Sequence, residues 1–189
     1  MATAEQPPRL TIRPARREDA PALREIFNDA VEDGLATFDS TLRSIDEQKD
    51  LIAAAEEDSR RPLLVAEVRN WVCGVVSIQP HEQELHGGEV GEVTVFVRRS
   101  FRSYGVGRQL MRVAQTEAAR LGYRKLVGRV LADNEESLQL CRATGWRVVG
   151  VHEQHARHGS RLRDVALVEY LLPAVPRPND GPAAREKLE

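Results

Sequence analysis

The stretch Glu92–Met111 constrains the fold more than any other part of the chain, because it joins a strand pattern to a glycine-bearing turn and a helix pattern. Three valines alternate with Thr94 and Phe96, and this excess of β-branched residues predicts a strand. Gly105 and Gly107 then remove side chains where the chain turns into an amphipathic helix. Such a turn directs several backbone N–H groups at one point. The stretch therefore predicts a phosphate-binding turn directly after a strand.

Two well-known phosphate-binding motifs do not fit this turn. The P-loop requires a Lys and a Ser or Thr directly after its second glycine, whereas Gly107 is followed by Arg and Gln. The dinucleotide fingerprint requires a third glycine where this chain has Leu110. The pattern that fits is Arg-x-x-Gly-x-Gly over residues 102–107. On this hexapeptide alone, an ordinary strand-to-helix turn whose glycines relieve steric crowding is an equal alternative.

The rest of the chain predicts strands and helices on both sides of this stretch. Strands are expected at residues 10–13, 63–68, 72–78, 92–97, 123–131, 146–151 and 165–171. Helices are expected to begin near Asp19, at Ser44, after the glycine turn and near Asp133. Asp19 suits an N-cap, and Ser44 with Glu47 matches a capping box. The polar segment 153–163 is expected to be a loop. The order β-α-α-β-β-β-α-β-α-β-β predicts one α/β (α+β-like) domain with a mixed sheet and helices on both faces.

Composition indicates where the domain begins and ends, and it argues against several classes of partner. Residues 1–8 are expected to be disordered, 9–172 to form the domain and 173–189 to be a flexible proline-rich tail. The formal charge of −2 favours no nucleic acid partner, and no apolar run approaches the ~18 residues of a membrane span. The N-terminus has no apolar core of the kind found in signal peptides. Cys73 and Cys141 lie inside apolar patterns, so we expect reduced thiols in a cytoplasmic protein.

Five stretches carry a resemblance to a known family. They are Ile12–Ala15, Glu92–Val97, Arg102–Gly107, Asn134 with Ser137, and Arg157–Gly159 followed by Asp164 and Val165. In these stretches the chain resembles the GNAT superfamily of N-acetyltransferases, and most of all its phosphinothricin N-acetyltransferase subgroup. The resemblance implies the GNAT acyl-CoA N-acyltransferase fold and a homodimer. It also implies direct transfer of acetyl from acetyl-CoA, in a ternary complex, to the primary amine of a small amino acid or analogue of the phosphinothricin or methionine-sulfoximine type.

The resemblance implies where acetyl-CoA binds. The turn would hold the pyrophosphate, and the strand backbone and the start of the next helix would hold the pantetheine and the thioester. The implied residues are Val95, Phe96, Val97, Arg102, Ser103, Tyr104, Gly105, Val106, Gly107, Asn134 and Ser137. Plainer roles remain open for them: core packing for the strand, a solvated charged face for the arginines and a helix cap for Asn134. The histidines lack any spacing with Asp, Glu or Cys that argues for a metal site.

Acetylation of an amine requires a group that takes its proton. Glu92 is the first candidate, because the family places a proton-accepting carboxylate there; a salt-bridged or solvated Glu is the plain alternative, and Glu89 is a neighbouring candidate. His158 lies in an Arg-His-Gly triplet and is the second candidate, against an ordinary surface His. Both residues would contact the acceptor. The other histidines, His81 among them, are expected to be surface residues. Phe38 is implied to wall the substrate pocket, with core packing as the alternative.

Two features depart from the family. Cys141 stands where many members carry a Tyr that protonates the departing thiolate, so it is either a thiol donor or, as we expect, a core residue. The loop 79–88 is rich in acid and lacks the aromatic and arginine residues of the subgroup, so we expect an acceptor other than phosphinothricin itself. Two alternative functions stay open: N-acetylation of proteins or peptides, and a non-catalytic acyl-CoA-binding module.

Overall fold

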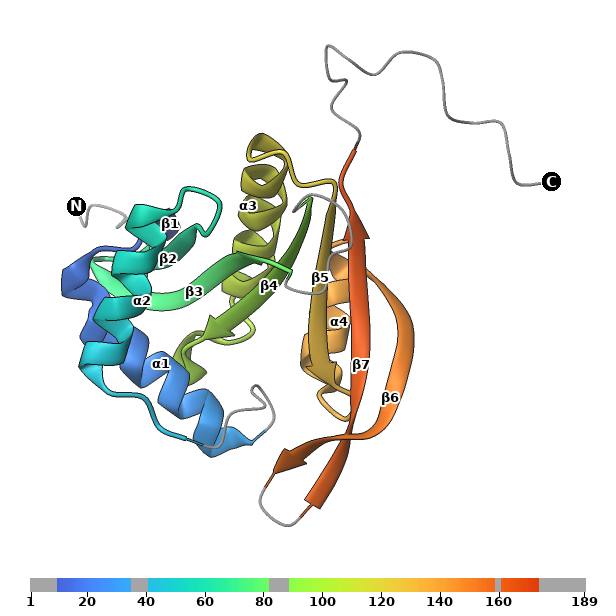
Figure 1. Cartoon of the computed structure of the whole chain (residues 1–189). Coiled ribbons are helices and arrows are strands. Elements are labelled where there is room, and N and C mark those ends of the chain that lie inside the picture. Colours follow the sequence, from blue (N-terminus) through green and yellow to red (C-terminus); the bar gives the residue numbers. More distant parts are fainter. Residues whose placement is uncertain (1–9, 35–40, 82–88, 159–160, 174–189) are drawn as a thin grey trace, which may run out of the picture.

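A seven-stranded sheet forms the centre of the described structure (Figure 1). The computed structural model describes residues 10–34, 41–81, 89–158 and 161–173. The strands are β1 (Leu10–Pro14), β2 (Leu63–Val68), β3 (Trp71–Pro80), β4 (Val90–Val97), β5 (Lys125–Leu131), β6 (Arg147–His158) and β7 (Arg161–Leu171), in the spatial order β1-β2-β3-β4-β5-β7-β6. β4 and β5 are parallel, and the other neighbours are antiparallel. The predicted mixed sheet is confirmed.

Helices cover both faces of this sheet, as predicted (Figure 1). They are α1 (Ala20–Asp33), α2 (Ile45–Glu57), α3 (Val106–Arg120) and α4 (Glu135–Ala143), with two short 3-10 turns, η1 (Arg17–Asp19) and η2 (Arg99–Phe101). α1 and α2 bury side chains such as Ile26 and Ile52 against one face. α3 and α4 bury side chains such as Leu110 and Leu138 against the other. Burial of these apolar side chains on both faces is the main favourable term in folding.

The two predicted helix caps have different outcomes. Ser44 caps α2 as predicted: its hydroxyl accepts the N–H of Glu47 at 3.2 Å, and the Glu47 carboxylate accepts the N–H of Ser44 at 2.6 Å. Asp19 stands at the N-cap of α1, but its side chain makes no capping hydrogen bond. The predicted N-cap position is therefore confirmed, but the carboxylate is bound by a donor from the preceding strand instead of by the first turn of α1.

The donor is Arg13 of β1, which holds Asp19 in a two-point ion pair. Arg13 Nη1 lies 2.7 Å from Oδ2 of Asp19 and Nη2 lies 3.0 Å from Oδ1, while the same guanidinium reaches Glu67 of β2 at 2.6 Å. Burial opposes ionisation of Asp19, but the hydrogen bonds from Arg13 and from the Arg16 N–H outweigh it and lower the pKa of the carboxyl. The cluster ties η1 and α1 to the edge of the sheet.

The predicted loop at 153–163 is wrong, because β6 and β7 continue through most of it as a two-stranded ribbon. Ala156, Arg157 and His158 pair with Arg163, Leu162 and Arg161. A register shift before this ribbon places Gln154 at φ 50°, where its N–H donates to Oδ1 of Asp164 at 2.7 Å. Backbone pairing therefore continues although the side chains are polar, and the periodicity of apolar residues gives no sign of it.

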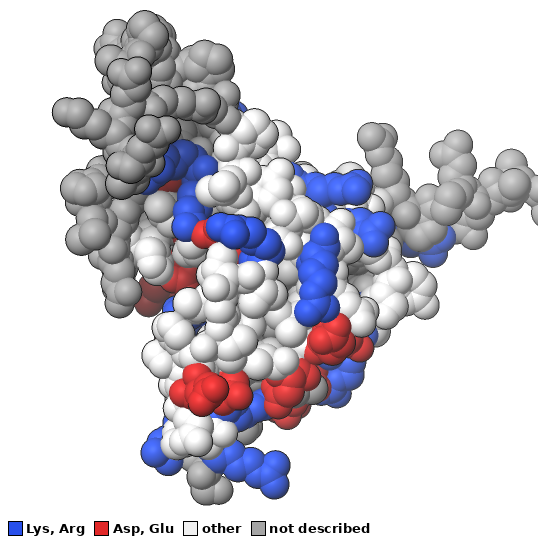
Figure 2. All heavy atoms as spheres, turned by 90° about the vertical axis from the view of Figure 1, so that its right-hand side faces the viewer, with Lys and Arg blue, Asp and Glu red and all other residues white. Residues whose placement is uncertain are grey.

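β6 is an edge strand, and its outer surface carries apolar side chains. Val148, Val149 and Val151 are all exposed, at 40%, 47% and 50%. Figure 2 views this side of the molecule and shows a broad uncharged surface between separate basic and acidic side chains. An exposed apolar edge strand is a surface on which another chain can pair.

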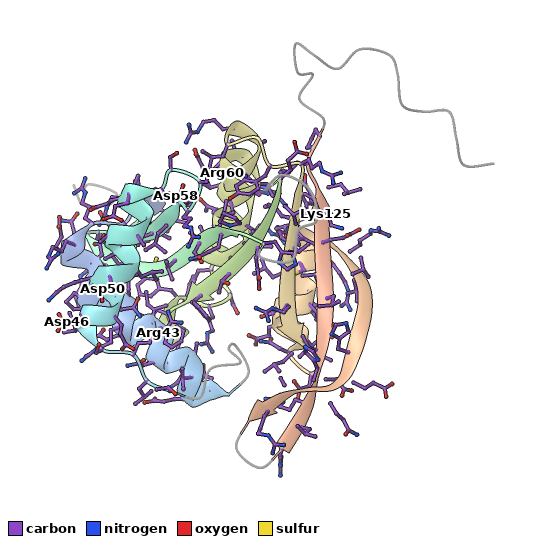
Figure 3. All side chains as sticks on the ribbon, in the orientation of Figure 1. Arg43, Asp46, Asp50, Asp58, Arg60 and Lys125 are labelled. Atoms are coloured by element: carbon purple, nitrogen blue, oxygen red, sulfur yellow. The ribbon has the colours of Figure 1, made fainter. Side chains whose placement is uncertain are left out.

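Side-chain contacts connect the segment before α2 to α1 and β4. The guanidinium of Arg43 lies over the Phe27 ring of α1, 3.8 Å from its centroid (Figure 3). Asn28 binds the backbone of Arg43 twice, accepting its N–H at 2.9 Å and donating to its carbonyl at 3.2 Å. Phe27 in turn packs edge-to-face on Phe96 of β4, with ring centroids 5.5 Å apart. α1 is therefore fixed against the strand that carries Glu92.

Candidate active site

Glu92 lies where two neighbouring strands part. The parallel ladder between β4 and β5 pairs Val90, Gly91 and Glu92 with Lys125, Leu126 and Val127, and the described residues pair no further along these strands. β4 nevertheless continues to Val97 and β5 to Leu131. The two strands diverge in Figure 1 beyond this point. Glu92 is thus the last paired residue before a gap in the centre of the sheet.

The backbone of β4 presents alternate residues to this gap. His81 donates its N–H to the carbonyl of Val90 at 2.9 Å, and Arg98 donates to the carbonyl of Cys73 at 2.9 Å, so the even-numbered residues of β4 face β3. Because alternate residues of a strand bond to opposite neighbours, the N–H groups of Val95 and Val97 face the gap. The N–H of Phe96 faces β3. This geometry supports two of the three predicted backbone donors and not Phe96.

The Glu92 carboxylate lies between the guanidinium of Arg129 in β5 and the imidazole of His81, which directly follows β3. Arg129 reaches Oε1 with Nε at 2.9 Å and with Nη2 at 2.7 Å. Nδ1 of His81 lies 3.4 Å from Oε2, and this nitrogen is buried without a hydrogen-bond partner. The salt-bridge alternative for Glu92 is therefore observed. It does not exclude a catalytic role, because Glu92 keeps 25% of its side chain exposed.

His81 and Arg129 are the residues that the sequence interpretation missed. His81 was expected to be a surface residue, but it lies directly after β3 and beside Glu92. Arg129 follows Val127, the partner of Glu92, by two positions and so shares a face with it. Alternation along residues 123–131 could have placed Arg129 on that face. The pairing register that brings it to Glu92 is absent from the sequence. Glu89, the neighbouring candidate, is paired instead with Arg124, 3.1 Å away.

The basic turn is not a set of free cations. Arg102 reaches Asp33 at the end of α1 with a 2.6 Å contact, and Arg99 binds the other oxygen of the same carboxylate. Burial opposes ionisation of Asp33, but the hydrogen bonds from Arg102 and Arg99 outweigh it and lower the pKa of this carboxyl. Arg98 pairs with Glu25 at 2.9 Å. The prediction that these arginines suit phosphate is thus qualified, because three of them hold the turn against α1.

The two glycines of the turn have separate structural causes. Gly105 is the N-cap of α3 and has φ 80°, a left-handed conformation that side chains disfavour. A Cβ on Gly107 would lie 3.0 Å from Cδ2 of Leu140 in α4, so its smallness allows α3 and α4 to approach. The first-turn N–H groups of α3 have no helical acceptors, and Gly105 has no side chain to cap them. This end of α3 is suited to an anion.

Asn134 caps the N-terminus of α4, which is one of the two roles that the sequence left open for it. Oδ1 of Asn134 accepts the N–H of Ser137 at 3.0 Å. Cys141, one turn further on, is buried in the core between α3 and α4, and burial raises the pKa of its thiol to about 11. A buried thiol of that pKa is a poor proton donor, so the core interpretation of Cys141 is the better one.

The acceptor side of the site is described in part. Phe38 and residues 82–88 lie outside the described residues, and of His158 only the backbone is described, paired with Arg161 near the tip of the β6–β7 ribbon. A hollow of about 730 Å³ lies between the end of β5 and the base of this ribbon, lined by Ala132, Asp133, Arg161, Leu162, Arg163 and Asp164. Arg163, one of these lining residues, binds both Asp133 and the Gly34 carbonyl that follows α1.

The parted parallel strands, the glycine turn into the N-terminus of α3 and the carboxylate of Glu92 are the features that the resemblance to the GNAT superfamily of acyltransferases implies. Residues 9–147 match the family model of the acetyltransferase (GNAT) domain, and the chain belongs to this family of acetyl-CoA-dependent N-acetyltransferases. It is 28% identical to the phosphinothricin N-acetyltransferase of Streptomyces viridochromogenes over 170 residues, 88% of this chain and 91% of that one.

Solved structures agree with this assignment. The ribosomal-protein-alanine N-acetyltransferase of Brucella melitensis has a TM-score of 0.82 and 30% identity, with 86% of this chain and 99% of that chain covered. The yncA protein of Salmonella typhimurium, solved with its cofactor acetyl-CoA, has a TM-score of 0.83 and 25% identity, with 92% and 99% covered. Within the described ranges, no group of His, Cys, Asp and Glu could hold a metal ion, and no helix is long and apolar enough to cross a membrane.

Proposed function

We propose that the protein transfers the acetyl group of acetyl-CoA directly to the primary amine of a small amino acid or amino-acid analogue, in a ternary complex. The observation that carries this proposal is the position of Glu92. Its carboxylate stands at the last β4–β5 pair, next to the gap that Val95 and Val97 line with their N–H groups. The proposed proton acceptor and the proposed oxyanion donors thus belong to the same strand, β4.

Each part of the site has a role in this chemistry. Glu92 accepts a proton from the acceptor ammonium, directly or through water, and leaves a neutral amine that can attack the thioester carbonyl. The N–H groups of Val95 and Val97 stabilise the negative charge that develops on the carbonyl oxygen. The turn 102–107 and the first turn of α3 hold the pyrophosphate, and Asn134 and Ser137 contact the pantetheine. Solvent protonates the departing thiolate, because Cys141 is buried.

A protein or peptide acceptor is the second candidate function. It is favoured by the similarity to the Brucella melitensis protein, whose name states that it acetylates ribosomal protein alanine. The similarity to phosphinothricin N-acetyltransferase favours a free amino acid. His158 is retained here as a proposed second contributor to acceptor binding or proton transfer, and Phe38 as a proposed wall of the acceptor pocket.

A thiol-release assay over a panel of amino acids, simple amines and short peptides tests this proposal. We expect turnover with at least one free amino acid and weaker turnover with peptides that begin with the same residue. Stronger turnover with peptides would favour the second candidate. Absence of thiol release with every acceptor, while calorimetry detects acetyl-CoA binding, would instead identify a non-catalytic acyl-CoA-binding module.

We also propose that the protein is a homodimer, as the family resemblance implies, and that it lies in the cytoplasm. The exposed valines of the edge strand β6 support the homodimer, because a second copy of the chain could cover them. The free, buried thiols of Cys73 and Cys141 suit a reducing compartment. Light scattering at micromolar concentration should give twice the mass of one chain. Val149→Lys places a charge on the edge and should shift the protein toward the monomer. A monomeric wild-type protein would contradict the proposal.

A further inference from the structure

The two oxygens of the Glu92 carboxylate have different surroundings. Arg129 binds Oε1, with Nε at 2.9 Å and Nη2 at 2.7 Å. Oε2 instead faces Nδ1 of His81 at 3.4 Å. This nitrogen is closed off from solvent and has no hydrogen-bond partner among the described residues. A hydrogen-bond acceptor, Oε2, therefore lies directly beside a buried nitrogen that lacks a partner.

The proton of the neutral His81 ring has a preferred place. A carboxylate oxygen offers only lone pairs, and a neutral imidazole has one nitrogen with a proton and one with a lone pair. If the proton were on Nε2, two lone pairs would face each other where water does not reach, and Nδ1 would stay unsatisfied. With the proton on Nδ1, a shift of about half an ångström brings the pair into the normal N–H···O range.

The backbone holds the imidazole beside Glu92. Pro80 is in register with Gly91 of β4, and the N–H of His81 donates to the carbonyl of Val90 at 2.9 Å. Proline fixes its own φ, so the chain enters His81 in a defined direction. His81 is thus bonded to the same strand that carries Glu92, two residues away from it. The strand that presents the carboxylate also fixes the position of the imidazole.

We infer that His81 is a positioning residue for Glu92. Its Nδ1–H donates to Oε2 while Arg129 holds Oε1, so the carboxylate cannot rotate away from the acceptor. Each carboxylate oxygen has two lone pairs, and Oε2 keeps one of them to receive the proton of the acceptor ammonium. A base is most effective when it is held within hydrogen-bond reach of that proton. This inference rests on the proposed function and assigns part of its rate to His81.

Substitutions that remove or keep the donor test this inference in the purified full chain. His81→Phe keeps a planar ring without the N–H. With the best acceptor of the panel, we expect it to lower kcat by about 10- to 100-fold, the usual effect of one hydrogen bond to a charged group. The affinity for acetyl-CoA, measured by calorimetry, should stay within about 2-fold. His81→Asn places an amide N–H near the position of Nδ1 and should restore kcat to within about 5-fold of the wild type.

A double-variant cycle shows whether His81 acts through Glu92. In the Glu92→Gln protein we expect His81→Phe to change kcat by less than about 3-fold, because the carboxylate that His81 positions is gone. A purely structural role would instead lower kcat by the same factor in both backgrounds. His152→Phe, which removes an exposed histidine of β6 that packs on His155, is the control and should leave kcat unchanged. Thermal unfolding of each variant monitors stability.

The tautomer of His81 gives a measurement that does not depend on activity. The hydrogen bonds of a neutral imidazole determine which of its nitrogens carries the proton. Nitrogen NMR of the histidine rings, with His81 assigned by the loss of its signals in His81→Asn, should place the proton on Nδ1. Glu92→Leu removes the acceptor and should move the proton toward Nε2.

The inference and the proposed function fail in different ways. Unchanged kcat in His81→Phe, no recovery in His81→Asn, or an equal loss in the Glu92→Gln background would each overturn the inference while turnover still supports the proposed function. An imidazole protonated only at Nε2 would overturn the inference whether or not an acceptor is found. The proposed function fails only when the wild type acetylates no acceptor, and a proton on Nδ1 would then make the contact a structural one.

Discussion

Glu92→Gln is expected to lower kcat by about 10²–10⁴-fold, the usual contribution of a positioned general base. Gln has nearly the shape of Glu and can still accept hydrogen bonds from Arg129, but it cannot take the proton of the acceptor ammonium. The acetyl-CoA side should be unaffected, because the turn 102–107 and the first turn of α3 do not contact this carboxylate in the described hydrogen bonds and ion pairs. The loss should therefore be in turnover and not in cofactor binding.

Steady-state kinetics and calorimetry with acetyl-CoA measure the two effects separately. The matched substitution is Glu89→Gln, directly before β4, where the carboxylate pairs with Arg124. We expect it to change kcat by less than about 3-fold, since removal of a partly exposed ion pair has a small effect. A large loss in Glu89→Gln together with an active Glu92→Gln would assign the base to Glu89. Retained activity in both would leave His158 as the candidate.

Arg13→Met is expected to be the substitution with the largest effect on stability, about 2–4 kcal/mol of unfolding free energy. It removes the partner of Asp19, whose side chain is only 6% exposed, and leaves a buried carboxylate with a single backbone donor, the N–H of Arg16. The range lies below that of a fully buried pair because Arg13 retains 23% exposure. Urea denaturation measures the difference. Arg61→Met, which breaks an exposed pair with Asp58, is the control and should cost less than about 1 kcal/mol.

The pH dependence of this effect has a definite sign. The pKa of Asp19 is lowered in the folded protein, so its ionisation stabilises the fold above the unfolded pKa of about 4, and this contribution is lost as the pH falls through the folded pKa. The difference between the wild type and Arg13→Met should therefore be full at pH 7 and shrink below pH of about 4. A difference that stays constant down to pH 3 would show that Arg13 acts through packing of its aliphatic stem.

Local signals in the sequence predicted the parts of the fold that depend on neighbouring residues. The strand at 92–97 and the helix that follows it have strong periodicity, and the Ser44 capping box is complete within four residues. The ribbon at 153–163 was missed because its strands are held by the backbone ladder rather than by an apolar face. The ion pair of Asp19 with Arg13 was missed because Arg13 belongs to a different element, so the residues next to Asp19 give no sign of it.

Only those residues of the candidate site that belong to short sequence motifs could be predicted. Glu92, the glycine turn and Asn134 could be named because each belongs to a short pattern. Arg129 and Asp33 could not, because they are 37 and 66 residues from the groups that they bind, Glu92 and Arg99. Contacts of this kind depend on strand register and helix placement, which no local pattern specifies.

The short ladder between β4 and β5 also determines how the two halves of the sheet are held together. Only three residue pairs join the strands β1–β4 to the strands β5–β7 in the described structure. Beyond them the halves are connected by side chains such as Arg129, which binds Glu92, and by the helices, where Gly107 of α3 lies close to Leu140 of α4. A larger residue at position 107 would press on Leu140 and so push α3 and α4 apart, which makes the size of this residue one of the factors that hold the two halves at their present separation.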